Sequence, residues 1–235
     1  MKPAYRGIAY GLLALAPAVG WAGGKASIES GSGSNTVRSS IEYDGQGAVR
    51  MDVSGQAGNY MLVRDGKVYS VVSQNGQPMV LDMGGMMKMM GGIAQQQMQQ
   101  PMAGTRNVAD MVSLRATGAS ETVAGIDGRV YELTYVDDAG TQRTETMVLS
   151  TDPRARELTQ AMFAMSQSMA QSMQIEVPSG GAELESEIAA GKHGILRYGG
   201  DFRIVSFDTG SPAASRFALP AEPAQLPDFG KMLGR

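Results

Sequence analysis

Apolar and polar side chains alternate through much of the first third of the chain. In Val37–Tyr43 and Val49–Val53, apolar side chains occupy alternate positions, which is typical of half-buried antiparallel strands. Three dipeptides that tolerate positive φ lie between such stretches: Asp44-Gly45, Asp65-Gly66 and Asn75-Gly76. The pattern therefore predicts tight hairpins, and the clearest of them joins Asn59–Arg64 to Lys67–Ser73.

Strand-like alternation returns from Met111 onward. Arg129–Val136 and Gln142–Leu149 flank the turn sequence Asp137-Asp138-Ala139-Gly140, and together they predict another hairpin. Two more short strands are expected near the end of the chain, at Gly194–Tyr198 and Phe202–Phe207.

A helical period lies between the hairpin at Arg129–Leu149 and the two short strands near the end of the chain. Thr151-Asp152-Pro153 has the form of an N-cap followed by proline in the first turn, and it predicts a helix that runs to about Gln174. Apolar residues at steps of four, three, four and four line one face of this helix: Leu158, Met162, Met165, Met169 and Met173. A shorter helix is expected at Ala182–Ala190.

Three segments show neither the strand period of two nor the helical period. Residues 23–35 are rich in Gly and Ser and are expected to form a flexible leader. Residues 83–102 form a methionine-rich insertion whose Gly pairs disfavour a rigid helix, so we expect a mobile crossover or lid there. The Pro-rich tail, residues 220–235, is expected to be extended or disordered. Residues 36–219, which include this insertion, are predicted to form a single β-rich domain.

The first 22 residues have the three parts of a secretory signal peptide. Lys2 and Arg6 precede an apolar run, Ile8–Val19, and Gly20-Trp21-Ala22 offers small residues at the positions that a signal peptidase recognises. The run is too short for a membrane-spanning helix, and no Cys follows it that could be acylated. We therefore expect cleavage after Ala22, a periplasmic location and no stable membrane anchor after cleavage.

Charge and composition narrow the classes of partner. Cleavage would remove two of the 20 Lys and Arg residues and none of the 23 Asp and Glu residues, and would change the net charge from −3 to −5. Nucleic acid and anionic membranes bind clustered positive charge, so neither is an expected partner. The chain has no Cys, which excludes disulfides, thiolate metal sites and thiol nucleophiles.

One stretch resembles a known family. Within Thr117–Asp152, the run ETVAGIDGRVYELTY (Glu121–Tyr135) resembles the Thr-Ile-Ala-Gly-Tyr…Tyr signature of an uncharacterised family of secreted bacterial proteins, a domain of unknown function whose fold is similar to that of the LolA and LolB lipoprotein carriers. The chain departs from the signature at Ile126, where the family has an aromatic residue, and it lacks the Cys often found in the family's second strand.

The resemblance implies an α+β fold. Its main element would be a strongly curved antiparallel sheet, a half-barrel, with two or three helices packed on the concave face. It also implies an apolar cleft between sheet and helices, where carriers hold acyl chains.

The sequence offers little for catalysis. His193 is the single histidine, and it lies between glycines with no nucleophile or metal-ligand spacing nearby. The chain has no P-loop, dinucleotide fingerprint, nucleophile elbow or HExxH motif. We therefore expect a protein that is not an enzyme and that needs no cofactor.

Methionine is the unusual feature of the composition, with 18 residues, nine of them between Met79 and Met111. Its flexible, polarisable side chain suits surfaces that adapt to varied apolar partners. We expect the insertion to form a lid and the long helix to form one wall of a binding cleft for a lipid, an acyl chain, another apolar ligand or an envelope protein. Ordinary core packing is the competing interpretation of the helix stripe. The candidate ligand-binding residues are Met86, Met87, Met89, Met90, Met98, Met162, Met165, Met169 and Met173.

A second hypothesis is Cu(I) handling, because thioethers select Cu(I) and need no Cys. Met86, Met87, Met89 and Met90 would supply the sulfurs, although Lys88 among them would repel a cation and no His accompanies them. A third hypothesis is an envelope protein-interaction module whose methionine-rich loop docks a partner chain.

Overall fold

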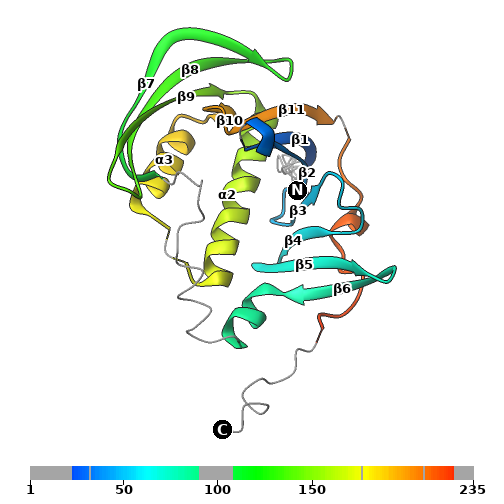
Figure 1. The fold of residues 1–235 in the computed structure, drawn as a ribbon. Coiled ribbons are helices and arrows are strands. Elements are labelled where there is room, and N and C mark those ends of the chain that lie inside the picture. The colour runs from blue at the N-terminus through cyan, green and yellow to red at the C-terminus, as the bar shows by residue number, and fades with distance from the viewer. Residues whose placement is uncertain (1–22, 32, 90–107, 176, 209, 225–235) are drawn as a thin grey trace, which may run out of the picture.

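A computed structural model describes residues 23–31, 33–89, 108–175, 177–208 and 210–224. The predicted signal peptide, most of the methionine-rich insertion with Met90 and Met98, and the end of the tail lie outside the described residues. Figure 1 shows the fold, which is built on one antiparallel sheet of 11 strands in the order β6-β5-β4-β3-β2-β1-β11-β10-β9-β8-β7. The strands are β1 (Gly24–Ser30), β2 (Val37–Tyr43), β3 (Val49–Val53), β4 (Tyr60–Arg64), β5 (Lys67–Gln74), β6 (Gln77–Asp82), β7 (Val108–Val123), β8 (Ile126–Asp137), β9 (Gln142–Ser150), β10 (Gly194–Tyr198) and β11 (Phe202–Asp208).

The predicted hairpins form, but the connection at Asp44-Gly45 is a longer loop, residues 44–48, and not a two-residue turn. β4 and β5 pair Arg64 with Lys67 across the two-residue turn Asp65-Gly66, in which both residues have positive φ. β5 and β6 are joined in the same way across Asn75-Gly76. The hairpin of β8 and β9 also forms, and its turn is held by Asp137, whose Oδ1 accepts hydrogen bonds from the backbone of Ala139 and Thr141.

The prediction of a flexible leader at residues 23–35 is wrong for Gly24–Ser30, which form the central strand β1. This strand is paired on both sides, with β2 and β11, and its Ala26 and Ile28 are buried. A Gly- and Ser-rich composition indicated flexibility, but two neighbouring strands satisfy the backbone of β1 and hold it in place. Small residues also have a packing reason here, since a methyl group at Gly24 would lie 2.6 Å from the hydroxyl of Tyr43.

The sheet bends sharply at the β7 end. β7 contacts β11 although β8, β9 and β10 lie between them in the sheet. Neighbouring strands are about 4.8 Å apart, so four such steps in a flat sheet would separate β7 from β11 by roughly 19 Å. Three register shifts along the β7–β8 pair supply the bend, because each bulge kinks the strand and increases its twist.

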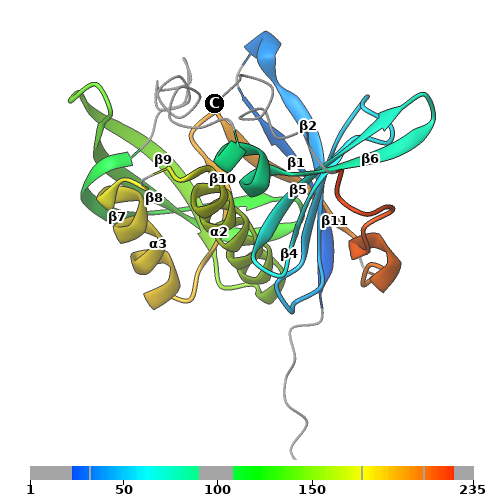
Figure 2. The ribbon, with the colours of Figure 1, turned by 90° about the horizontal axis from the view of Figure 1, so that it is seen from below.

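Two long helices pack against the sheet. Helix α2 (Pro153–Met173) begins as predicted, with the side chain of Asp152 accepting a hydrogen bond from the backbone of Arg154 and Pro153 in the first turn. It contacts β1, β3, β5 and β10 and thus lies across both halves of the sheet, as Figure 2 shows. Helix α3 (Ser179–Ala190) contacts β7. No helix among the described residues is long and apolar enough to cross a membrane.

The expectation that the Gly pairs prevent a helix at the start of the methionine-rich insertion is wrong, because residues 83–89 are helical. This helix lies near the C-terminal end of α2, since a methyl group at Gly84 would be 3.7 Å from Ser172. Met83 and Met87 are four residues apart and share one face, which is half-buried at Met83 and buried at Met87. Burial of this face offsets the low helix propensity of Gly.

The segment after β11 crosses the other face of the sheet. We call residues 210–224 the C-terminal strap. Phe217 of the strap is buried and belongs to a small core that also contains Leu62, Tyr69 and Val71. The strap ends beside β6, where the backbone N–H of Ala224 donates to the carbonyl of Val80. The described part of the predicted tail, residues 220–224, therefore bends first and then pairs with the sheet edge at Pro223.

Candidate functional site

Six methionines from two strands, α2 and the helix at residues 83–89 pack against the core cluster that includes Leu158 of α2. We call this set the methionine layer, and all of its members are partly buried and pack against one core cluster: Met51, Met61, Met83, Met162, Met165 and Met169. Met51 on β3 and Met61 on β4 are directly opposed in the antiparallel register. The layer therefore combines side chains from two strands, α2 and the helix at residues 83–89.

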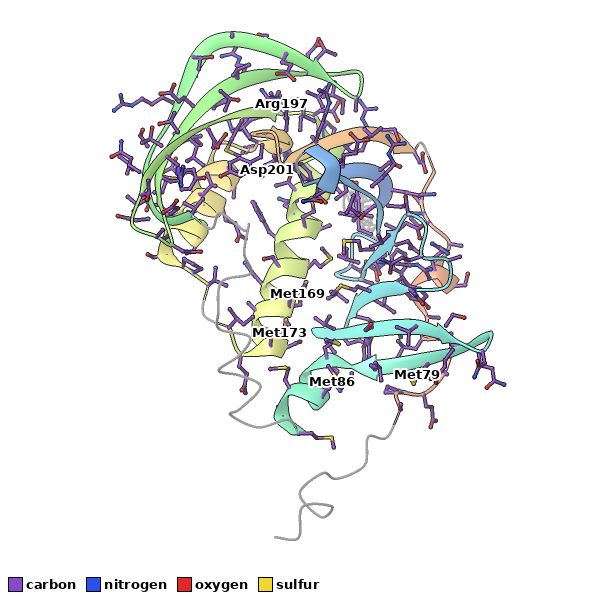
Figure 3. The ribbon with its side chains drawn as sticks, in the orientation of Figure 1. Met79, Met86, Met169, Met173, Arg197 and Asp201 are labelled. Carbon is purple, nitrogen blue, oxygen red and sulfur yellow. The ribbon has the colours of Figure 1, made fainter. Side chains whose placement is uncertain are left out.

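The predicted stripe on α2 forms one side of this layer. Leu158 is fully buried, and Met162, Met165 and Met169 continue its face along the helix over partly exposed positions. This placement agrees with the interpretation of the stripe as core packing. Met173, the last predicted member, is partly buried at the end of α2, and Figure 3 places it near Met86.

The candidate residues of the insertion do not converge. Met87 is buried, Met86 is half-buried and Met89 is 37% exposed, because consecutive positions of a helix point in different directions. Met90 and Met98 lie outside the described residues. In the part of the insertion that the structure describes, the side chains of Met86, Met87 and Met89 therefore do not point toward one place, as a copper site would require.

Sequence reasoning missed the strand side of the layer. Met51 and Met61 occupy ordinary alternating positions, and nothing local distinguishes them from core residues. Only the register that opposes these two residues, together with the crossing of α2, makes them part of the layer. The period of two indicates that Met51 and Met61 lie on the buried face of a strand, but it does not indicate which residues from other elements lie beside them.

Two small cavities touch α2. One, of about 100 Å³, lies between α2 and the β2–β3 turn, and the other, of about 190 Å³, lies between α2 and α3. Both are smaller than the roughly 300–1,000 Å³ typical of small-molecule sites. A larger cavity, of about 560 Å³, lies between the β2–β3 turn, the β4–β5 turn and the C-terminal strap.

Two carboxylates near the helices and the β8–β9 turn have structural partners. Asp137 holds its own turn and also accepts a hydrogen bond from Arg143, and these bonds lower the pKa of its carboxyl group. Glu185 on α3 accepts a hydrogen bond from Gln167 on α2. No group of three or more His, Cys, Asp or Glu side chains in the described ranges is arranged to hold a metal ion.

His193 lines the small cavity between α2 and α3, together with Phe163 and Lys192. Its ring lies 5.5 Å from that of Tyr131. Desolvation by burial, and then the charge of Arg129, lower the pKa of the imidazole. Burial therefore favours the neutral form of His193, which packs against an aromatic ring.

This shift predicts a pH dependence of stability. The folded protein binds a proton at His193 less readily than the unfolded chain, so the free energy of unfolding should fall as the pH drops through about 6.5. We expect the urea midpoint to fall more between pH 7.5 and pH 5.5 in the wild type than in His193→Gln. The lowered pKa values of Asp137 and Asp152 place the titration of these carboxyls below this window. Equal losses in both proteins would show that His193 does not carry the effect.

Comparisons with protein-family models, with curated proteins and with solved structures gave no match.

Proposed function

We propose that this protein is a non-catalytic periplasmic binding or carrier protein, which holds an apolar ligand or an apolar segment of a partner protein at the methionine layer. The observation that supports this most is that six partly exposed methionines from separate elements pack against one core cluster. Because thioether side chains are flexible and polarisable, such a layer can repack around apolar groups of different shape.

The proposed route of entry lies between α2 and strands β3 and β4. Since the two cavities beside α2 are small, an acyl chain would enter by displacing methionine side chains. The methionines of the layer are less deeply buried than Leu158 at the start of α2. The C-terminal half of α2 would therefore move away from the sheet more easily than its start.

The proposal extends to the fold. We infer that the sheet is a half-barrel that curves around α2 and α3, as in the lipoprotein carriers that the Glu121–Tyr135 run resembles. The contact between β7 and β11 supports strong curvature, and the contacts of α2 with strands on both halves of the sheet support a helix on the inner face.

Export is part of the same proposal and rests on the signal-peptide pattern of residues 1–22. Cleavage after Ala22 would leave Gly23 as the first residue, directly before β1. All described strands would then be retained in the processed chain, residues 23–235.

The proposal predicts saturable binding of a fluorescent fatty acid by the processed chain. Met165→Glu should weaken this binding by at least about tenfold, because a carboxylate in the layer would have to be desolvated against the ligand. Met111→Glu is the matched control, since Met111 is also partly buried but packs against the core near α3. Absence of saturable binding, or equal weakening by both variants, would contradict the proposal.

A triple substitution of Met162, Met165 and Met169 by Leu separates the proposed function from Cu(I) binding at the methionine layer itself. Leucine preserves apolar volume and removes sulfur. Fatty-acid binding should remain within about threefold of the wild type, as expected for volume-conserving swaps. If the protein instead binds Cu(I) stoichiometrically and loses that binding in the triple variant, the layer is a metal site and the carrier proposal is wrong.

A further inference from the structure

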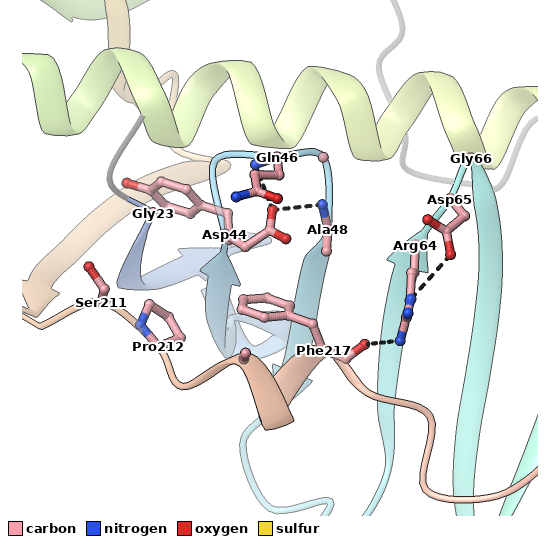
Figure 4. Close-up of a pocket in the computed structure, with 13 residues that line it drawn as sticks. Gly23, Asp44, Gln46, Ala48, Arg64, Asp65, Gly66, Ser211, Pro212 and Phe217 are labelled. Atoms are coloured by element: carbon pink, nitrogen blue, oxygen red, sulfur yellow. Dashed lines mark hydrogen bonds and ion pairs between the residues drawn. The ribbon is translucent and has the colours of Figure 1, made fainter. Parts of the chain in front are cut away.

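The largest cavity described above lies apart from the methionine layer and shares no lining residue with it. Three segments that are distant in the sequence enclose it, together with Gly23, the first residue of the proposed processed chain: residues 43–48, residues 64–66 and residues 211–217. Its volume of about 560 Å³ falls within the range of small-molecule sites. Figure 4 shows Asp44 on one side of this cavity and Arg64 on the other.

The carboxylate of Asp44 lines the cavity, and only one of its two oxygens accepts hydrogen bonds from the described residues. Its Oδ1 accepts hydrogen bonds from the backbone N–H groups of Gln46 and Ala48, at 2.7 and 2.9 Å. These bonds form the β2–β3 turn and orient the side chain. Oδ2 accepts no hydrogen bond from the described residues, so one oxygen of a fixed carboxylate remains for a donor.

Arg64 is the corresponding cation. Its Nε donates to Asp65 at 3.1 Å, and its Nη1 donates to the backbone carbonyl of Phe217 at 3.4 Å. The second bond ties the arginine to the C-terminal strap. Nη2 donates to no residue in the described part of the chain, and the side chain is 46% exposed. A planar guanidinium with a free nitrogen is suited to pairing with a carboxylate.

We propose that this cavity binds a small zwitterion, a free α-amino acid or a short peptide, with its ammonium group on Asp44 and its carboxylate on Arg64. The charges of the lining select this class. A ligand with only anionic groups would be repelled by Asp44 and Asp65, and a ligand with only a cation would leave Arg64 without a new partner. Pro212, Ala214 and Ala48 supply apolar surface for the side chain of the ligand.

Binding at this place also has a structural consequence. The cavity is closed on one side by the strap, which Arg64 already contacts. A ligand that bridges Asp44 and Arg64 would link the β2–β3 turn to the β4–β5 turn beneath the strap. It should therefore raise the thermal stability of the folded protein, by an amount that grows with the logarithm of the ratio of ligand concentration to Kd.

Calorimetric titration and thermal-shift measurements on the processed chain test this inference. The ligands are α-amino acids, dipeptides and tripeptides, each compared with its N-acetylated and its C-amidated form. We expect saturable binding of one length class, and at least about tenfold weaker binding when either charge is blocked. These ligand arms need no variant protein, so they test the proposal even if a substitution impairs folding. No saturable binding by any zwitterion, or unchanged binding of the blocked forms, would overturn it.

Two substitutions locate the site. Asp44→Asn keeps an oxygen that can accept the turn hydrogen bonds but removes the charge, and Arg64→Gln removes the guanidinium. Each should weaken zwitterion binding by at least about tenfold. Arg38→Gln is the matched control, because Arg38 is an exposed arginine that pairs with Glu29 away from the cavity. Binding that survives both cavity substitutions, or that is lost equally in the control, would show that the zwitterion does not occupy this cavity. Fatty-acid binding should be unchanged in all three variants, so failure of this inference can be distinguished from failure of the carrier proposal.

Discussion

Replacing Gly194 with alanine is expected to destabilise the protein by at least about 3 kcal/mol, because a methyl group there has no space. Gly194 begins β10, and its added Cβ would overlap the backbone of Ala155 and Arg156 in the first turn of α2. These neighbours are main-chain atoms, which cannot move aside as a flexible side chain can. Accommodation would require α2 to lift from β10 and would disturb Leu158 and Leu196, which are fully buried.

Urea unfolding followed by circular dichroism measures this effect, and Gly200→Ala provides the control. Gly200 lies in the β10–β11 turn, its φ is not positive, and no heavy atom would lie within 4 Å of its added Cβ. The control should change the free energy of unfolding by less than about 0.5 kcal/mol. A Gly194→Ala protein as stable as this control would show that α2 does not approach β10 as closely as described.

Replacing Arg216 with methionine is expected to cost about 2 kcal/mol by removing the main anchor of the C-terminal strap. The guanidinium of Arg216 makes two hydrogen bonds with Glu42, at 2.7 and 3.0 Å, and one with Asp52 at 3.3 Å. The side chain of Glu42 is only 6% exposed, and without Arg216 its nearest cation is Lys25 at 3.9 Å. A nearly buried carboxylate that loses its partner is costly, whereas the 41% exposure of Arg216 itself reduces the effect.

A double substitution tests the cause of this loss. If the cost arises from the unpaired carboxylate, Glu42→Gln combined with Arg216→Met should recover about half of the stability lost in Arg216→Met. Arg38→Met is the control for removing an arginine from an exposed ion pair, and it should cost less than about 1 kcal/mol. Equal losses in Arg216→Met and Arg38→Met would indicate that the strap is not held by Glu42.

Both predictions concern contacts between elements far apart in the sequence. Gly194 meets α2 some 40 residues earlier, and Arg216 meets Glu42 of β2 across 174 positions. Neither contact produces a recognisable pattern in the sequence around Gly194 or Arg216. A glycine before a strand and an arginine near a Pro-rich tail are ordinary features, and only their neighbours in three dimensions give them large expected effects.

Local patterns determined most of the secondary structure. Alternation at Arg129–Val136 requires only that one face of a strand is buried, and positive φ at Asp65-Gly66 requires only a residue type, so both could be predicted without a structure. The start of α2 follows from Asp152 and Pro153 for the same reason, since capping acts within a few residues.

Tertiary structure decided the rest, because burial and pairing are set by segments that are distant in the sequence. The Gly- and Ser-rich residues 24–30 become the central strand only because β2 and β11 lie on either side, and residues 83–89 are helical beside the end of α2. The same holds for both candidate sites. Methionines at unremarkable positions on β3 and β4 pack against the same core cluster as α2, and Asp44, Arg64 and Phe217 come together around one cavity, because the sheet brings these segments side by side.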